Sequence, residues 1–133
     1  MTQLCGQLRS LHLHQSGVKL LCVVDSHLLT VDTAVPLSLF AVEAVTNSYR
    51  HGFPDNRVGT IVLSFSVQGA EGRMQIEDDG IGFDPSNAFT SMGHQLMSAF
   101  SHQLGGTLDM KSADSGGTMV TLTYPLNGTH SAN

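Results

Sequence analysis

The side chains best suited to catalysis or ligand binding lie in one stretch, from about residue 33 to residue 51, that the sequence predicts to be a helix. Before His51, its only acidic, amide and basic side chains are Glu43, Asn47 and Arg50, within an arc of roughly 60°. An amide oxygen suits Mg²⁺, a carboxylate can orient an attacking group, and a guanidinium can hold a phosphate. Two interpretations stay open: a magnesium-nucleotide site, or a surface ion pair of Glu43 and Arg50 bridged by Asn47.

The rest of this helix is largely apolar, so we expect most of it to be buried. One contiguous face is predicted to pack on a sheet and consists of Leu37, Phe40, Ala41, Ala44, Val45 and Ser48. Leu39, Val42 and Tyr49 make up much of the remaining surface. The few strongly polar side chains of such a helix must meet each other, water or a ligand.

A second candidate region begins with two adjacent carboxylates, Asp78 and Asp79, at the end of an apolar alternating run. Gly80 and Gly82 follow, and they give a backbone that can approach a flat ligand closely. A carboxylate held there can accept a hydrogen bond from an exocyclic amino group such as that of adenine. A tight turn with local Asp bonding is the simpler explanation of the same residues. Since one hairpin separates Asn47 from Asp78, we expect both at one edge of the sheet.

The predicted elements position these residues in a small α/β fold. The pattern indicates a strand at 18–24, the helix at about 33–51, a hairpin of 61–67 with 74–77, a helix around 96–104 and a last hairpin of 107–112 with 119–124. Pro36 is expected near the first turn of its helix, where a missing N–H costs nothing. This order predicts a two-layer α/β sandwich, a mixed sheet with helices on one face.

Length and composition limit the chain to one such domain. It has 133 residues, of which 41% are hydrophobic and only 13% charged, and its formal net charge is −5. The acidic balance argues against nucleic-acid binding and against docking on anionic lipid. Two cysteines, no apolar run long enough to span a bilayer and no signal-peptide pattern predict a cytoplasmic protein without direct membrane contact.

Four short motifs follow one another along the chain, at residues 43–51, 78–83, 91–97 and 116–118. Together they resemble the N, G1, G2 and G3 boxes of the GHKL superfamily. The sequence is most similar to the ATP-binding catalytic domain of sensor histidine kinases of the HWE-like branch, and the segment Gln103-Leu104-Gly105-Gly106-Thr107 strengthens that similarity. The resemblance covers roughly residues 18–125 and implies a Bergerat-type ATP-binding fold with ATP and Mg²⁺ as cofactors.

Carried over by position, the resemblance implies a catalytic group formed by Glu43, Asn47 and Arg50. Asn47 would coordinate Mg²⁺, Arg50 would contact phosphate, and Glu43 holds the position of the polar or catalytic residue one turn earlier. His51 would pack beside the phosphates. Gly93 and the amides after it would face phosphates at a helix N-terminus.

The resemblance also implies an adenine pocket. Asp78 would read the adenine amino group, Gly80 and Gly82 would line the base pocket, and Thr118 would lie near it. Residues 84–92 would form a short ATP lid. This lid contains no Lys or Arg, so the phosphate charge would be met by Mg²⁺, Arg50 and backbone amides.

The resemblance implies a partner as well, because a histidine kinase needs a phosphoacceptor histidine on a dimerising helical hairpin. We predict a helical stub or linker at 1–14, whose Leu4, Leu8 and Leu11 recur at helical spacing, the catalytic domain at 15–126 and a flexible tail at 127–133. The partners would be the phosphoacceptor domain and, indirectly, a response regulator of two-component signalling. The isolated domain is expected to be a monomer and the full protein a dimer.

Two other functions remain open. Small anti-sigma-factor-like serine kinases share the motif styles at 43–47 and 79–85 and phosphorylate a protein serine. A degenerate scaffold that binds partners is the non-enzymatic alternative. Its support is in the G2 box, where Ser91 replaces a usual glycine and His94 a usual aliphatic residue.

Overall fold

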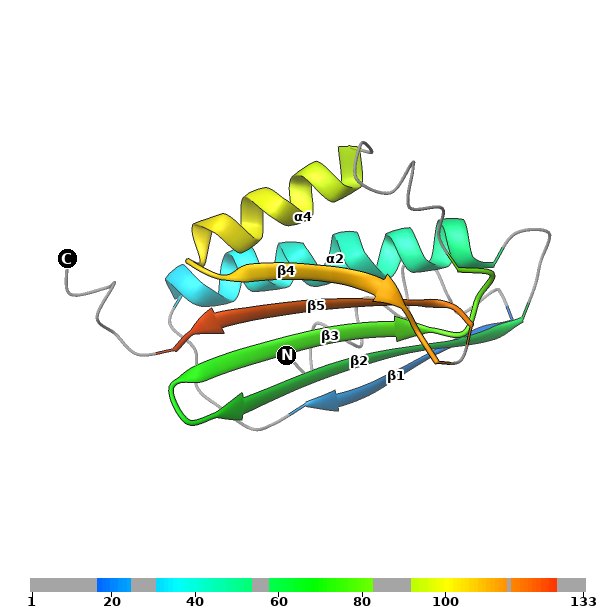
Figure 1. Cartoon of the computed structure of the whole chain (residues 1–133), viewed down its shortest axis with the longest axis horizontal. Helices are drawn as coiled ribbons and strands as arrows, with labels where there is room; N and C mark the ends of the chain where they lie inside the picture. Colours follow the sequence, from blue (N-terminus) through cyan, green and yellow to red (C-terminus); the bar gives the residue numbers. More distant parts are fainter. Residues whose placement is uncertain (1–16, 25–30, 54–57, 83–91, 115, 127–133) are drawn as a thin grey trace.

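The chain folds into one five-stranded sheet covered by two helices (Figure 1). The computed structural model describes residues 17–24, 31–53, 58–82, 92–114 and 116–126. The elements are β1 (Val18–Val24), α2 (Val31–Gly52), β2 (Gly59–Gln68), β3 (Glu71–Asp78), α4 (Met92–Gln103), β4 (Thr107–Ser112) and β5 (Thr118–Pro125). This order of elements is the one that the sequence predicts.

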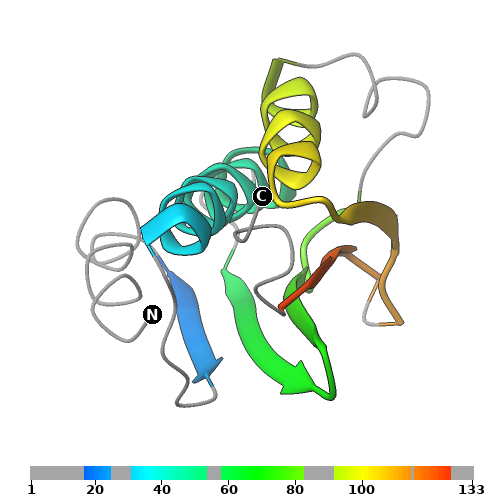
Figure 2. The same cartoon turned by 90° about the vertical axis from the view of Figure 1, so that its left-hand side faces the viewer.

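The sheet is mixed and has the strand order β1-β2-β3-β5-β4. β1 pairs with β2 in parallel, and the remaining neighbours are antiparallel. β2 and β3 are joined at Gly69, whose positive φ of 59° suits a tight hairpin turn. Seen along the sheet, both helices lie on the same side of it (Figure 2). The predicted two-layer α/β sandwich is therefore confirmed.

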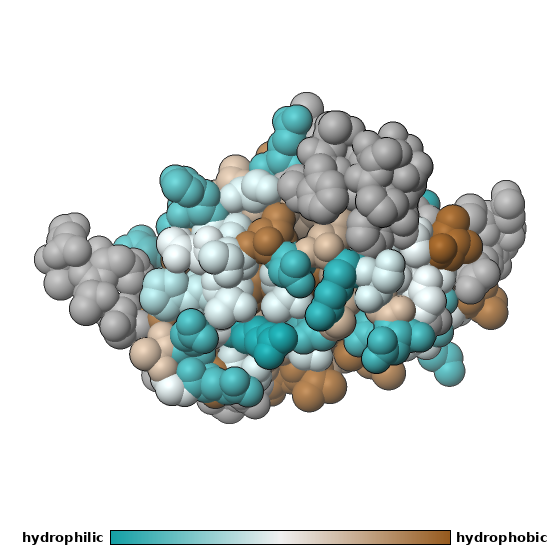
Figure 3. Space-filling view, in the orientation of Figure 1, coloured by the Kyte–Doolittle hydropathy of each residue, from teal (hydrophilic) through white to brown (hydrophobic). Residues whose placement is uncertain are grey.

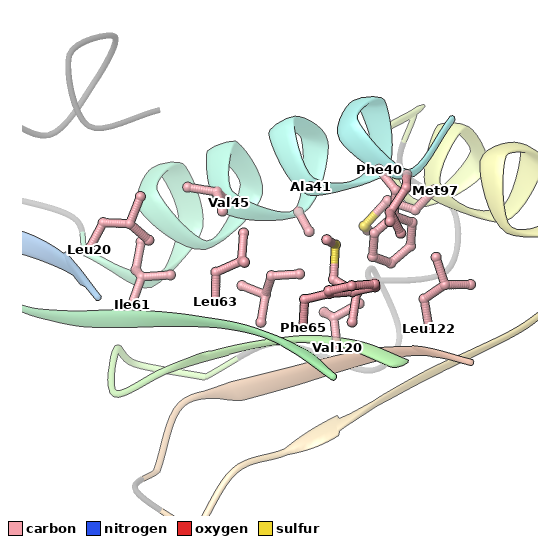
Figure 4. Packing of buried hydrophobic residues seen from close by; sticks show 14 of the residues in the cluster. Leu20, Phe40, Ala41, Val45, Ile61, Leu63, Phe65, Met97, Val120 and Leu122 are labelled. Carbon is pink, nitrogen blue, oxygen red and sulfur yellow. The ribbon is translucent and has the colours of Figure 1, made fainter. Parts of the chain in front are cut away.

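The core lies between the helices and the sheet (Figure 4). On β2 and β3 every second residue points into it, and most of these residues are buried, although Val67 near the end of β2 is only partly buried. The predicted sheet-packing face of α2 is confirmed, since all of its members are buried: Leu37, Phe40, Ala41, Ala44, Val45 and Ser48. Met97 of α4 joins the same cluster beside Phe40 of α2, so the second helix also packs on this core.

Two expectations about α2 are wrong. The helix begins at Val31, so Pro36 lies inside it rather than in its first turn. Since Pro36 is the sixth helical residue, its missing N–H removes a bond to the carbonyl of Asp32. The helix is also less buried than its composition suggested, because Val35 and Leu39 are 52% and 46% exposed. Only one stripe of a helix can contact the sheet beneath it, and these residues lie on the opposite stripe.

The direction of the elements determines what lies near the ends of the strands. β1 and β2 run in parallel, α2 returns in the opposite direction, and β3 again opposes β2 (Figure 1). The C-terminal ends of α2 and β3 therefore lie at the same end of the sheet. The β4–β5 turn reaches this end too, since Thr118 begins β5 there.

The surface that faces the viewer in Figure 1 is mostly polar or mildly polar, with apolar residues in separate patches (Figure 3). Among the described helices, none is both long and apolar enough to cross a membrane. The predicted stub at 1–14 and tail at 127–133 lie outside the described residues, and so do the lid residues 84–91.

Candidate functional site

Asp78 is the centre of the candidate site. It is the last residue of β3, it follows the inward-facing positions Met74 and Ile76, and its side chain is only 2% exposed. Its Oδ1 accepts hydrogen bonds from the backbone N–H groups of Gly80, at 3.0 Å, and Thr118, at 3.2 Å. A buried carboxylate is stable only with such donors, so the two amides fix both the position and the orientation of this group.

Glycines make this close arrangement of backbone and carboxylate possible. A Cβ added at Gly117 would overlap the carbonyl oxygen and Oδ1 of Asp78. Gly82 has a φ of 87°, and a Cβ there would lie 3.1 Å from the carbonyl oxygen of Gly116. The end of β3 and the β4–β5 turn are thus packed backbone to backbone. Gly117 was not among the predicted site residues, although the Gly-Gly-Thr motif at 116–118 contained the signal.

Asp79 has a different partner from Asp78, although the two carboxylates are adjacent in sequence. Its Oδ1 accepts the N–H of Thr60 at 2.8 Å, and its own N–H donates to the carbonyl oxygen of Thr60 at 3.2 Å. Sequence reasoning missed this contact, because the pairing of β2 with β3 at Ile61 and Asp78 cannot be derived from composition or periodicity.

The polar stripe of α2 is less enclosed. Glu43 and Asn47 are half-buried and Arg50 is exposed. In the part of the chain that the structure describes, no side-chain hydrogen bond or ion pair joins any two of these three residues. The alternative of a surface ion pair bridged by Asn47 is therefore not what the structure forms, and the three side chains remain available to another group.

The structure brings most of the predicted residues to one end of the sheet. Asn47 lies toward the C-terminal end of α2, on the side of the molecule where β3 ends at Asp78 (Figure 1). The N–H of Thr118 contacts Asp78 directly. Gly93 lies in the first turn of α4 and His51 in the last turn of α2. The His51 and His94 side chains and Ser91 fall outside what the structure describes.

The donor set at this end suits a nucleotide held together with a hard cation. No group of three or more His, Cys, Asp and Glu side chains within the described ranges could hold a metal ion alone. Mg²⁺ in proteins is commonly bound by one or two side chains together with substrate phosphates. The amide oxygen of Asn47 and the nearby carboxylate of Glu43 fit that pattern, since both are half-buried oxygen donors on one helix flank.

Comparison with known proteins gives the class. The family model described as "Histidine kinase-, DNA gyrase B-, and HSP90-like ATPase" matches residues 33–128, and the chain belongs to this family. Membership implies ATP binding. The predicted GHKL assignment and its mixed α/β fold are thereby confirmed.

Among individual proteins, the chain is 28% identical over 117 residues to the Blue-light-activated histidine kinase 2 of Erythrobacter litoralis (strain HTCC2594). This match covers 85% of the chain and 34% of that kinase, so the chain spans about a third of its relative. The fold is similar to that of the Erythrobacter litoralis EL346 blue-light activated histidine kinase, with a TM-score of 0.86 and 24% identity over 98% of this chain and 42% of the other. The ATP binding domain of PrrB from Mycobacterium tuberculosis is similar over 95% of this chain and 93% of its own, with a TM-score of 0.76 and 21% identity.

Proposed function

We propose that this domain binds ATP with Mg²⁺ and donates the γ-phosphate to a histidine on a separate phosphoacceptor domain. The observation that carries the proposal is the buried Asp78 carboxylate, which two backbone amides hold at the end of β3. An acceptor fixed in this way recognises a donor on a flat ligand, and the exocyclic amino group of adenine is such a donor. The family and its histidine-kinase relatives support the same ligand.

The remaining residues have roles that follow from their position and chemistry. Asn47 would supply an oxygen to Mg²⁺, and Glu43, one turn earlier, would orient a water or group bound to it. Arg50, exposed at the same end, would hold a phosphate through its guanidinium. Mg²⁺, when bound, would neutralise charge on the phosphates.

A second set of groups would surround the nucleotide. Gly80 and Gly82 would line the base, and Thr118 would lie beside it. Gly93, in the first turn of α4, and His51, at the end of α2, would face the phosphates. In the transfer itself, an imidazole nitrogen of the acceptor bonds to the γ-phosphorus, the bond to the bridging oxygen breaks, and ADP leaves. Catalysis would then consist mainly of positioning and charge neutralisation.

The acceptor belongs to a partner domain in this proposal. The whole protein would be a dimeric histidine kinase of two-component signalling that passes phosphate to a response regulator. Its catalytic domain would act in the cytoplasm, where ATP is available. The described domain alone would bind nucleotide without becoming phosphorylated on histidine.

The substitution Asp78→Asn tests the proposal. Asparagine keeps an oxygen that can accept the N–H groups of Gly80 and Thr118, but its other atom is a donor that opposes the amino group of adenine. We expect a folded variant whose ATP affinity, measured by calorimetry, falls at least roughly tenfold. Glu77→Gln is the matched control, because it removes the same charge from the adjacent residue and should leave affinity unchanged.

Three results would contradict the proposal. Unchanged ATP binding by Asp78→Asn would remove the assignment of adenine reading to this carboxylate. With γ-labelled ATP and a histidine-bearing helical hairpin, acid-labile label is expected on the hairpin. Acid-stable label on an anti-anti-sigma partner instead would favour the serine kinase, and failure of the wild type to bind ATP would favour the scaffold.

A further inference from the structure

We propose that Asp79 is a positioning residue, which holds Asp78 in place for adenine by a closed pair of hydrogen bonds with Thr60. The inference rests on the proposed function, since it concerns the residue that supports the adenine-reading carboxylate. Asp79 itself would not touch the nucleotide. Its role would be to fix the point at which the chain leaves the sheet.

The evidence begins with the ladder between β2 and β3. Ile61 stands opposite Asp78, so Thr60 and Asp79 form the next antiparallel pair. The N–H of Asp79 donates to the carbonyl oxygen of Thr60 at 3.2 Å, as a regular ladder requires. The returning bond differs, because the N–H of Thr60 donates to the side-chain Oδ1 of Asp79 at 2.8 Å. The carboxylate thus takes the place that a backbone carbonyl would have in a continuing ladder.

This exchange explains how β3 can end abruptly without losing its last pair. Thr60 keeps both of its ladder bonds, while the backbone after Asp79 turns away from β2. That turn brings the N–H of Gly80 back to Oδ1 of Asp78, at 3.0 Å. If the side chain of Asp79 were removed, the N–H of Thr60 would be left without this acceptor, and the turn would lose the bond that fixes it. The direct consequence would be a less well placed Asp78 carboxylate.

Packing around the Asp79–Thr60 pair strengthens it. A Cβ added at Gly59 would overlap the ring of Phe53 and would lie 2.5 Å from Oδ1 of Asp79. Phe53 is only 6% exposed and directly follows α2. The edge of the ring and the carboxylate therefore both lie over Gly59, where any side chain at residue 59 would displace one of them. The same contact ties the end of α2, which carries Asn47, to the strand end that carries Asp78.

The test uses the whole chain and two nucleotides, ATP and inosine triphosphate, whose base has a carbonyl oxygen where adenine has the amino group. Calorimetry gives the affinity of each nucleotide and therefore their ratio. Asp79→Ala is expected to lower ATP affinity about tenfold and to change inosine triphosphate affinity far less, so that the ratio approaches one. Asp79→Asn retains an oxygen for Thr60 and should restore both the ATP affinity and the ratio. Glu77→Ala, which removes a carboxylate on the other side of Asp78, should leave both unchanged.

The outcomes separate this inference from the proposed function. The positioning role would be overturned if Asp79→Ala lowered the affinity for both nucleotides equally. It would also be overturned if Asp79→Asn showed the same reduced affinity ratio as Asp79→Ala. So would an unchanged ratio in Asp79→Ala. Should Asp79→Ala fail to fold, Asp79→Asn still tests the inference, because a collapsed ratio in that folded variant overturns it. A wild type without preference for ATP would instead overturn adenine reading by Asp78, and the inference with it.

Discussion

Asp78 and Tyr124 are both buried polar side chains on the helix-facing side of the sheet, each only 2% exposed, but they lie at opposite ends of it. Each also lies against a glycine. A Cβ at Gly117 would overlap Asp78, and a Cβ at Gly72 would lie 2.5 to 2.8 Å from the ring carbons and hydroxyl of Tyr124. The two ends differ in hydrogen bonding. Asp78 accepts two backbone N–H groups, whereas the Tyr124 hydroxyl has no partner within the described part of the chain.

The difference follows from the cost of burying each group. A buried charge without donors is too costly to persist, so the donors at Asp78 are a requirement of having a carboxylate there at all. An unpaired hydroxyl costs less and is tolerated where the ring fills the core. One end of the sheet therefore holds a carboxylate fixed by backbone donors, and the other holds an aromatic ring that fills the core. Equivalent substitutions at the two ends should therefore have different effects on ATP binding.

The largest effect is expected from paired alanine substitutions at the two glycines. Gly117→Ala and Gly72→Ala each introduce a methyl group into an occupied space, and each should lower the free energy of unfolding by about 1–3 kcal/mol in urea titrations. Only Gly117→Ala displaces Asp78, so only this variant should also lose ATP affinity, by tenfold or more in calorimetry. Equal affinities of the two folded variants for ATP would contradict the functional difference between the two ends.

A second prediction concerns the open part of the site, the stripe on α2. Asn47→Ala should leave the unfolding free energy within about 0.5 kcal/mol, because this half-buried side chain has no partner among the described residues to lose. It should remove the Mg²⁺-dependent part of ATP binding. Changes to residues that only support a metal ligand lower metal affinity by roughly 10- to 100-fold, and we expect the loss of a direct ligand to cost at least as much. Calorimetry with and without Mg²⁺ measures this part.

Thr46→Ala is the control for Asn47→Ala, since it alters the neighbouring half-buried residue on another face of the same helix. This control should keep the wild-type response to Mg²⁺. A wild-type response in Asn47→Ala as well would mean that the asparagine has only a structural role in the helix.

Much of the fold could be predicted because local patterns and packing agree. The bounds of β1 and β4 are as predicted, and the buried face of α2 follows from its 3.6-residue period. α4 ends at Gln103, and Gly105, with a φ of 70°, follows it as the expected helix-terminating glycine. The start of α2 could not be predicted in the same way. Pro36 is typical of a first helical turn and favoured a start near residue 33, whereas Val31 and Asp32 give no stronger indication of a helix start.

The assignment of the site residues stays a prediction, and the contacts around Asp78 were not predicted. Asp78 was identified by its position between an apolar strand and two glycines, which is local information. The Asp79–Thr60 pair and the overlap of Gly117 with Asp78 join residues that are 19 and 39 positions apart in sequence. Such contacts depend on strand register and on which hairpin adds to β3, and neither is written in the local pattern.

The smallest effect at neutral pH is expected from Tyr124→Phe. Below pH 10 the change removes only an unpaired buried hydroxyl, so stability should be unchanged or slightly higher. Burial raises the pKa of Tyr124 from 10.0 to about 12, so between these values the unfolded chain releases a proton that the folded chain keeps. Stability that is fully present below pH 10 is therefore lost as the pH rises toward 12, by roughly 2–3 kcal/mol for a shift of this size.

Unfolding titrations of wild type and Tyr124→Phe at pH 7 and at steps from pH 9 to pH 12 isolate this effect, because other groups that titrate there are common to both proteins. The difference in unfolding free energy should be near zero at pH 7 and should grow in favour of the variant above pH 10. ATP affinity at pH 7 should be the same for both, since Tyr124 lies at the end of the sheet opposite Asp78. A variant that is much less stable at pH 7 would show that the hydroxyl has a partner in solution. The contrast between the paired carboxylate and the unpaired hydroxyl would then be lost.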